Sequence, residues 1–65
     1  MTHYVCTVEF RDRASGAIDH FVRELSASDG SVASDEIERA FLTEHAGDQR
    51  DLEIAEIVCM PEGNH

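Results

Sequence analysis

The 65-residue chain contains no lysine and no tryptophan, and it has a single proline and only two cysteines. Its basic side chains are five arginines against 14 aspartates and glutamates, which gives a formal net charge of -9 at pH 7. Phosphate backbones repel a chain this acidic, so direct binding of nucleic acid is excluded. The anionic leaflet of a membrane repels it for the same reason.

Long apolar runs are also missing. No segment approaches the roughly 20 apolar residues that a membrane-spanning helix needs. The N-terminus has neither the basic nor the apolar region of a signal peptide, so we expect a cytoplasmic protein. Cysteines there are normally thiols. Because Cys6 and Cys59 lie in separate apolar runs without a Cys-x-x-Cys motif, we predict two thiols that behave as small hydrophobic residues.

The sequence shows no catalytic or cofactor motif, and no glycine-rich loop that could bind phosphate. A metal site needs ligands that converge on one point. His3 and Cys6 are the only close pair, and their spacing on a strand sends the two side chains to opposite faces. We predict that His20 is a core or edge histidine, and that a buried Cys6 beside it would be inert as a nucleophile. We therefore expect no enzyme, no metal site and no cofactor.

The first half of the chain predicts a β-hairpin. Residues 3–11 alternate in polarity and are rich in β-branched and aromatic side chains. Asp12–Gly16 has the composition of a five-residue hairpin loop, and residues 17–25 form the returning strand.

The second half predicts a helix and a third strand. The helix begins near Ser31 or Ser34, with a serine as N-cap and with Asp35 and Glu36 in its first turn. It ends near residue 46, with Gly47 as the C′ residue. Residues 52–60 form the third strand, and residues 61–65 form a frayed tail. We therefore expect a single domain, residues 1–65, that is ordered over about residues 3–60.

The element order β-β-α-β predicts an α+β fold. A right-handed crossover gives a three-stranded antiparallel sheet of order 2-1-3, with one helix packed on one face. We place the even-numbered strand positions against the helix: Tyr4, Cys6, Val8, Phe10, Ile18, Val22, Ile54 and Val58. Cys59 then points away from Cys6, which argues against a disulfide unless a bulge changes the alternation. Phe21, Leu25 and Ile57 become apolar anchors on the open face.

The acidic side chains are the candidate functional residues. The main group lies on the helix and the loop before it: Asp29, Asp35, Glu36, Glu38 and Glu44. A secondary group is expected on the open sheet face: Glu9, Asp19 and Glu53. Duplex DNA carries one negative charge per roughly 1.7 Å of axis. A rigid domain covered with carboxylates presents a related field, so the basic DNA-binding groove of a protein would attract it.

The Tyr4–Phe10 strand, the short hairpin, the acidic helix Ser34–Phe41 and the closing strand Leu52–Val58 resemble small phage or mobile-element proteins. Among these the chain is similar to anti-CRISPR proteins, and most to small acidic inhibitors of type I systems, type I-C among them. The resemblance covers about residues 3–60. It implies a monomeric, non-enzymatic inhibitor that occupies the DNA-entry surface of a Cascade-type complex.

Two other interpretations fit the same residues. Excess carboxylates without lysine are also typical of a small salt-adapted protein of a halophile. The chain could instead be an accessory module, antitoxin-like or phage-encoded, that binds a protein partner through its open sheet face.

Overall fold

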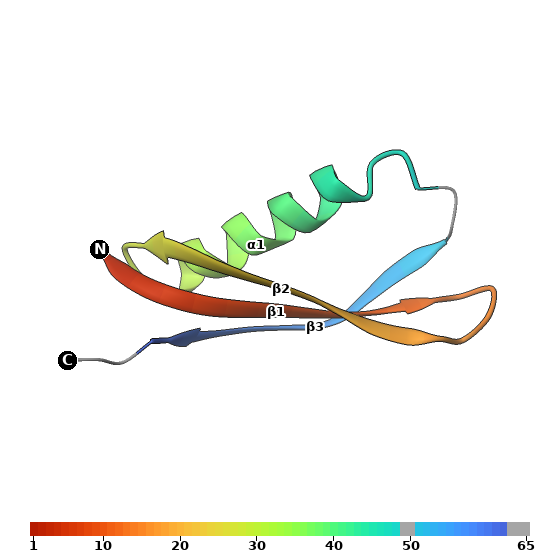
Figure 1. Ribbon diagram of the computed structural model, residues 1–65, viewed down its shortest axis with the longest axis horizontal. Helices are drawn as coiled ribbons and strands as arrows, with labels where there is room; N and C mark the ends of the chain where they lie inside the picture. Colours follow the sequence, from red (N-terminus) through yellow and green to blue (C-terminus); the bar gives the residue numbers. More distant parts are fainter. Residues whose placement is uncertain (49–50, 63–65) are drawn as a thin grey trace.

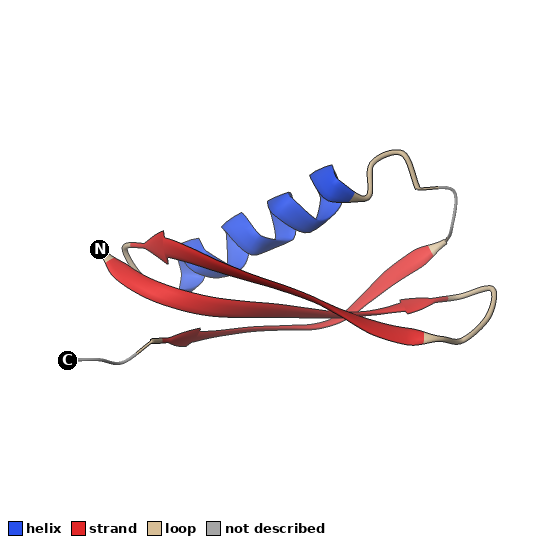
Figure 2. Ribbon diagram, viewed as in Figure 1, coloured by secondary structure: helices blue, strands red, loops and turns tan. Residues whose placement is uncertain are grey.

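A computed structural model describes residues 1–48 and 51–62. The elements are β1 (Thr2–Asp12), β2 (Ile18–Ala27), α1 (Gly30–Glu44) and β3 (Leu52–Pro61) (Figure 1). The three strands form an antiparallel sheet of order β2-β1-β3. Figure 2 shows the helix lying along one face of this sheet, and no helix or strand of the described residues lies on the other face. The predicted α+β fold and its strand order are confirmed.

The core lies between the central strand and the helix. Every second residue of β1 from Tyr4 to Phe10 is buried, and α1 contributes its buried stripe at helical spacing, Ala33, Ile37 and Phe41. The rings of Phe10 and Phe41 are 4.9 Å apart. Burial of each large apolar side chain contributes about 1.5–3 kcal/mol, so this row of contacts fixes which face of the sheet the helix covers.

The hairpin loop is one residue shorter than predicted. The amide of Asp12 donates to the carbonyl of Ala17 at 2.9 Å, and the amide of Gly16 donates to the carbonyl of Asp12 at 2.7 Å. Gly16 has a φ of 79°, a conformation that glycine adopts without strain. Since the residues between Asp12 and Ala17 number four rather than five, even positions of β1 pair with odd positions of β2.

This shift reverses the predicted faces of β2. Phe21 is buried against the helix, whereas Val22 is 49% exposed and Ile18 is 60% exposed. The prediction that Ile18 and Val22 face the helix is therefore wrong. A slip of one residue moves every side chain of a strand to the other face.

A bulge changes the alternation in β3. Phe10 pairs with Ile54 but Glu9 pairs with Glu56, so Ala55 is an extra residue without a partner in β1. Before the bulge, Ile54 packs against the core as predicted. After it, Ile57 packs against the core and Val58 is 41% exposed, the reverse of the prediction.

The same bulge brings the two cysteines together. Cys6 and Cys59 are direct partners in the β1–β3 register. Their Cα atoms are 4.0 Å apart and their sulfurs form a disulfide. The prediction of two thiols on opposite faces is wrong because the alternation changes at Ala55.

Both predicted helix caps are also wrong. Asp29 is the N-cap, and its side chain accepts a hydrogen bond from the amide of Val32 at 3.0 Å. The helix therefore begins earlier than a serine cap would allow, and its first turn contains no acidic residue. His45 is the C-cap and its amide donates to the carbonyl of Phe41 at 3.1 Å, so Ala46, not Gly47, follows the cap.

The C-terminal end of the sheet is longer than predicted. Pro61 pairs with Tyr4, and the amide of Glu62 donates to the carbonyl of His3 at 2.8 Å. These two residues are therefore held by β1 and do not belong to a frayed tail. The rest of the predicted tail, residues 63–65 with His65, and residues 49–50 of the predicted exit loop lie outside the described residues.

Candidate functional site

Three carboxylates cover the solvent-facing sides of α1. Ile37 is fully buried against the sheet, so its neighbours Glu36 and Glu38 project to the two flanks of the helix and Asp35 projects away from the sheet. All three are exposed, and none forms an ion pair with any residue in 1–48 or 51–62. We call Asp35, Glu36 and Glu38 the helix acidic surface.

The other two main candidates have structural partners. The carboxylate of Asp29 caps the helix through the amide of Val32. Glu44, in the last turn, accepts a hydrogen bond from Arg23 of β2 at 3.1 Å. The guanidinium of Arg23 also lies 4.3 Å from the centre of the Phe21 ring, so Glu44 helps to hold β2 against the helix.

The arginines of the sheet and of the hairpin loop form ion pairs with carboxylates. Arg11 donates to Glu53 at 2.8 Å, and Arg13 lies 3.4 Å from Glu53 and 3.5 Å from Asp51. On the helix, Arg39 is exposed and follows Asp35 by four residues, one turn along. The positive charge of the described sheet is thus locally neutralised, and the helix acidic surface keeps an excess of negative charge.

Glu53 and Glu9 lie on the open sheet face as predicted, opposite Arg11 and His20 respectively. The hydrogen bond from Arg11, with the nearby charge of Arg13, lowers the pKa of Glu53 below its usual value of 4.5. Glu9 lies 3.6 Å from the ring of His20. Both carboxylates are therefore less available to a partner than those of the helix acidic surface.

Two further predictions about β2 are wrong. Asp19 is the partner of Phe10, so it lies on the same side of the sheet as the helix rather than on the open face. His20 is exposed on the open face of β2, an edge strand, so of the two predicted alternatives it is the edge histidine. Cys6 pairs with Arg23, not with His20, so these two are not the cross-strand neighbours that were expected. The four-residue hairpin loop causes each of these errors.

The predicted apolar anchors of the open face are core residues. Phe21 is 7% exposed, and Leu25 and Ile57 pack against the core cluster. Other apolar residues of β2 and β3 take the open face instead, where Val22, Val58 and Met60 are 49%, 41% and 62% exposed. An apolar strip therefore does exist on this face, but none of the three predicted anchors belongs to it.

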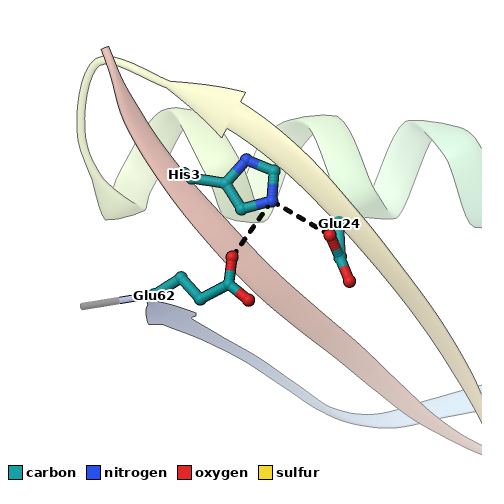
Figure 3. Close-up of side chains that lie close together, drawn as sticks. All are labelled: His3, Glu24 and Glu62. Atoms are coloured by element: carbon teal, nitrogen blue, oxygen red, sulfur yellow. Dashed lines mark hydrogen bonds and ion pairs between the residues drawn. The ribbon is translucent and has the colours of Figure 1, made fainter. Parts of the chain in front are cut away.

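A cluster of His3, Glu24 and Glu62 lies where the ends of the three strands meet (Figure 3). The Nε2 atom of His3 is 3.1 Å from Glu24 Oε1 and 3.2 Å from Glu62 Oε1. All three side chains are partly exposed. Sequence spacing could not reveal this cluster, because His3 and Glu24 lie on β1 and β2, Glu62 directly follows β3, and only the sheet register brings them together.

The chain matches no protein-family model, no curated protein and no solved structure. In residues 1–48 and 51–62 there is no helix both long and apolar enough to cross a membrane. The same residues enclose no pocket.

Proposed function

We propose that this protein is a non-enzymatic acidic inhibitor that binds the basic DNA-binding surface of a protein complex through its helix. A type I CRISPR surveillance complex is the partner implied by the resemblance to anti-CRISPR proteins. The observation that carries the proposal is the helix acidic surface, Asp35, Glu36 and Glu38, whose carboxylates have no ion-pair partner in the described chain.

The spacing of the carboxylates along the helix limits which nucleic-acid structure the helix can imitate. From Asp29 to Glu44 the axis rises about 22 Å, and five carboxylates project from this stretch. Duplex DNA carries about 13 phosphates over the same length, and one strand carries about six. Because Glu44 is paired with Arg23 and Arg39 adds a positive charge, the helix carries a smaller net charge than one strand over this length, and a much smaller one than the duplex. We propose that it occupies the contacts of one phosphate backbone, not those of a whole duplex.

The proposed site of action is a compartment that disfavours the disulfide. We place the inhibitor in the cytoplasm of the host cell, where thiols are normally kept reduced. The proposal therefore requires that the fold survives either because the buried Cys6–Cys59 bond resists reduction or because the reduced chain remains folded. Alkylation of free thiols in freshly lysed cells, followed by mass spectrometry, distinguishes these two states.

The direct test is a gel shift of a purified type I surveillance complex with its cognate duplex, with and without this protein, over a salt series. We expect loss of the shifted band at low salt and recovery of that band as salt weakens the competition. DNA binding that is untouched at every salt concentration would rule the proposal out for that complex. Folding in ordinary low-salt buffer separates it from adaptation to a halophile cytoplasm, since such a protein should lose its fold below molar salt.

A second candidate function is supported by the apolar strip on the open face. Val22, Val58 and Met60 form a solvent-exposed apolar strip on the sheet face that no helix or strand of the described residues covers. A protein partner docking there would depend on apolar contact more than on charge. Loss of activity on Val22→Asp, with the helix carboxylates intact, would favour this second function over the first.

A further inference from the structure

The His3–Glu24–Glu62 cluster has the chemistry of a metal site. We propose that these three side chains bind one divalent transition-metal ion of the zinc class. One imidazole and two carboxylates suit zinc, nickel or copper, whereas magnesium and calcium prefer sites made only of oxygen ligands. This proposal does not rest on the proposed inhibitory function.

The distances between ligand atoms fit such an ion. Bonds of about 2.0–2.2 Å to zinc place neighbouring ligand atoms about 3–3.5 Å apart. His3 Nε2 lies 3.1 Å and 3.2 Å from the two glutamate oxygens, and all three atoms lie within 4.8 Å of one another. Both glutamate oxygens face the same imidazole nitrogen, so an ion that replaces the His3–Glu24 hydrogen bond would have three ligands around it.

The backbone positions of the three ligands are fixed by the sheet. The amide of Glu62 donates to the carbonyl of His3, which ties two of the ligands together at 2.8 Å. Cys6, three residues after His3, is joined by the disulfide to Cys59, three residues before Glu62. Glu24 is held by its pairing with Val5 in β1. The site is thus built on paired strands, which reduces the entropy lost on binding.

The surroundings favour a cation. The chain carries a formal charge of -9, which raises the local concentration of cations at its surface. Three protein ligands would also leave coordination positions open for water or for an atom of a partner. In the described residues, no other group of three histidine, cysteine or carboxylate side chains converges in this way.

The chain contains a matched control. His20 lies 3.6 Å from Glu9 on the same open face, but it has no second carboxylate ligand among the described residues. His20→Ala and Glu9→Gln therefore remove the same chemical groups as His3→Ala and Glu62→Gln without touching the proposed site.

Isothermal titration calorimetry with zinc chloride, in buffer with excess magnesium to suppress non-specific carboxylate binding, tests the proposal. We expect saturable binding of one zinc per chain. His3→Ala and Glu62→Gln should each weaken it by about tenfold or more, while His20→Ala and Glu9→Gln leave it unchanged. Absence of saturable binding, or equal loss in the control variants, would overturn the site.

Paramagnetic broadening by Cu²⁺, an ion of the class proposed for the site, maps the site in amide NMR spectra without any substitution, so a variant that fails to fold cannot decide the outcome. We expect the amide signals of His3, Glu24 and Glu62 to broaden first. Earliest broadening at the helix acidic surface would instead assign cation binding to those carboxylates and overturn the proposal.

Discussion

Cys6 of β1 and Cys59 of β3 face each other directly across the sheet and are joined by a disulfide that spans 53 residues of sequence. The bond closes nearly the whole chain into one loop, so it restricts the unfolded state strongly. For a loop of this size the chain-entropy model gives about 4 kcal/mol of stabilisation. A domain of this length has about 3–10 kcal/mol in total, so the disulfide supplies a large share of it.

Reduction should therefore lower the free energy of unfolding by about 2–4 kcal/mol. Urea denaturation of the oxidised and reduced protein, followed by circular dichroism, measures the difference. A Cys6→Ala, Cys59→Ala variant should behave like the reduced protein and should not respond to reductant. Coincident unfolding curves for the oxidised and reduced protein would show that the bond does not constrain this fold.

The adjacent residues Phe21 and Val22 test the register of β2. Phe21→Ala should cost about 3–5 kcal/mol, because it leaves a cavity between the sheet and the helix. Val22→Ala should change stability by no more than about 0.5 kcal/mol, since that side chain is on the open face. If Val22→Ala were the more destabilising of the two, the hairpin would have the five-residue loop that the sequence suggested.

These two residues also show how far the sequence could predict the fold. The order of elements and the buried face of β1 followed from hydrophobic periodicity. The faces of β2 and of the second half of β3 could not be predicted in this way. One residue more or fewer in the hairpin loop or in β3 reverses which side chains face the helix. Phe21 and Val22 are both apolar, as are Ile57 and Val58, so the pattern could not reveal a four-residue loop or a bulge at Ala55.

The candidate functional residues were likewise predictable only in part. Exposure of Asp35, Glu36 and Glu38 was predictable, because they lie between buried residues of a helix with clear periodicity. The structural role of Asp29 was missed, since a serine a few residues later is an equally good cap in sequence terms. The His3–Glu24–Glu62 cluster was missed because it depends on long-range register.

Asp29→Ala should destabilise the protein by about 1 kcal/mol, because the amide of Val32 loses its acceptor. Ser31→Ala, at the exposed position first expected to cap the helix, is the control and should have a much smaller effect. Chemical denaturation of both variants makes the comparison. A larger loss for Ser31→Ala would move the start of the helix to the later position.

The ion pairs of Glu53 should make the stability of the fold sensitive to acid. The hydrogen bond from Arg11 and the charge of Arg13 lower its pKa below 4.5 in the folded state. A carboxyl whose pKa falls on folding stabilises the protein above its unfolded pKa, and this stabilisation is lost as pH falls through the lower folded value. Glu53→Gln should therefore flatten the dependence of unfolding free energy on pH below 4.5. An unchanged slope in this range, measured by urea denaturation, would show that the ion pairs do not persist in solution.

The central claim is that the helix acidic surface competes for a basic DNA-binding site. The variant Asp35→Asn, Glu36→Gln, Glu38→Gln removes three charges from the helix. The control Glu9→Gln, Asp19→Asn, Glu56→Gln removes three from the sheet. Both variants have the same net charge, so a difference between them reports position rather than total charge.

Displacement of cognate duplex from a type I surveillance complex by these two variants tests the claim most directly. We expect the control to displace DNA as well as the unmodified protein does, and the helix variant to leave the DNA bound. Equal displacement by the two variants, or greater loss in the control, would contradict it.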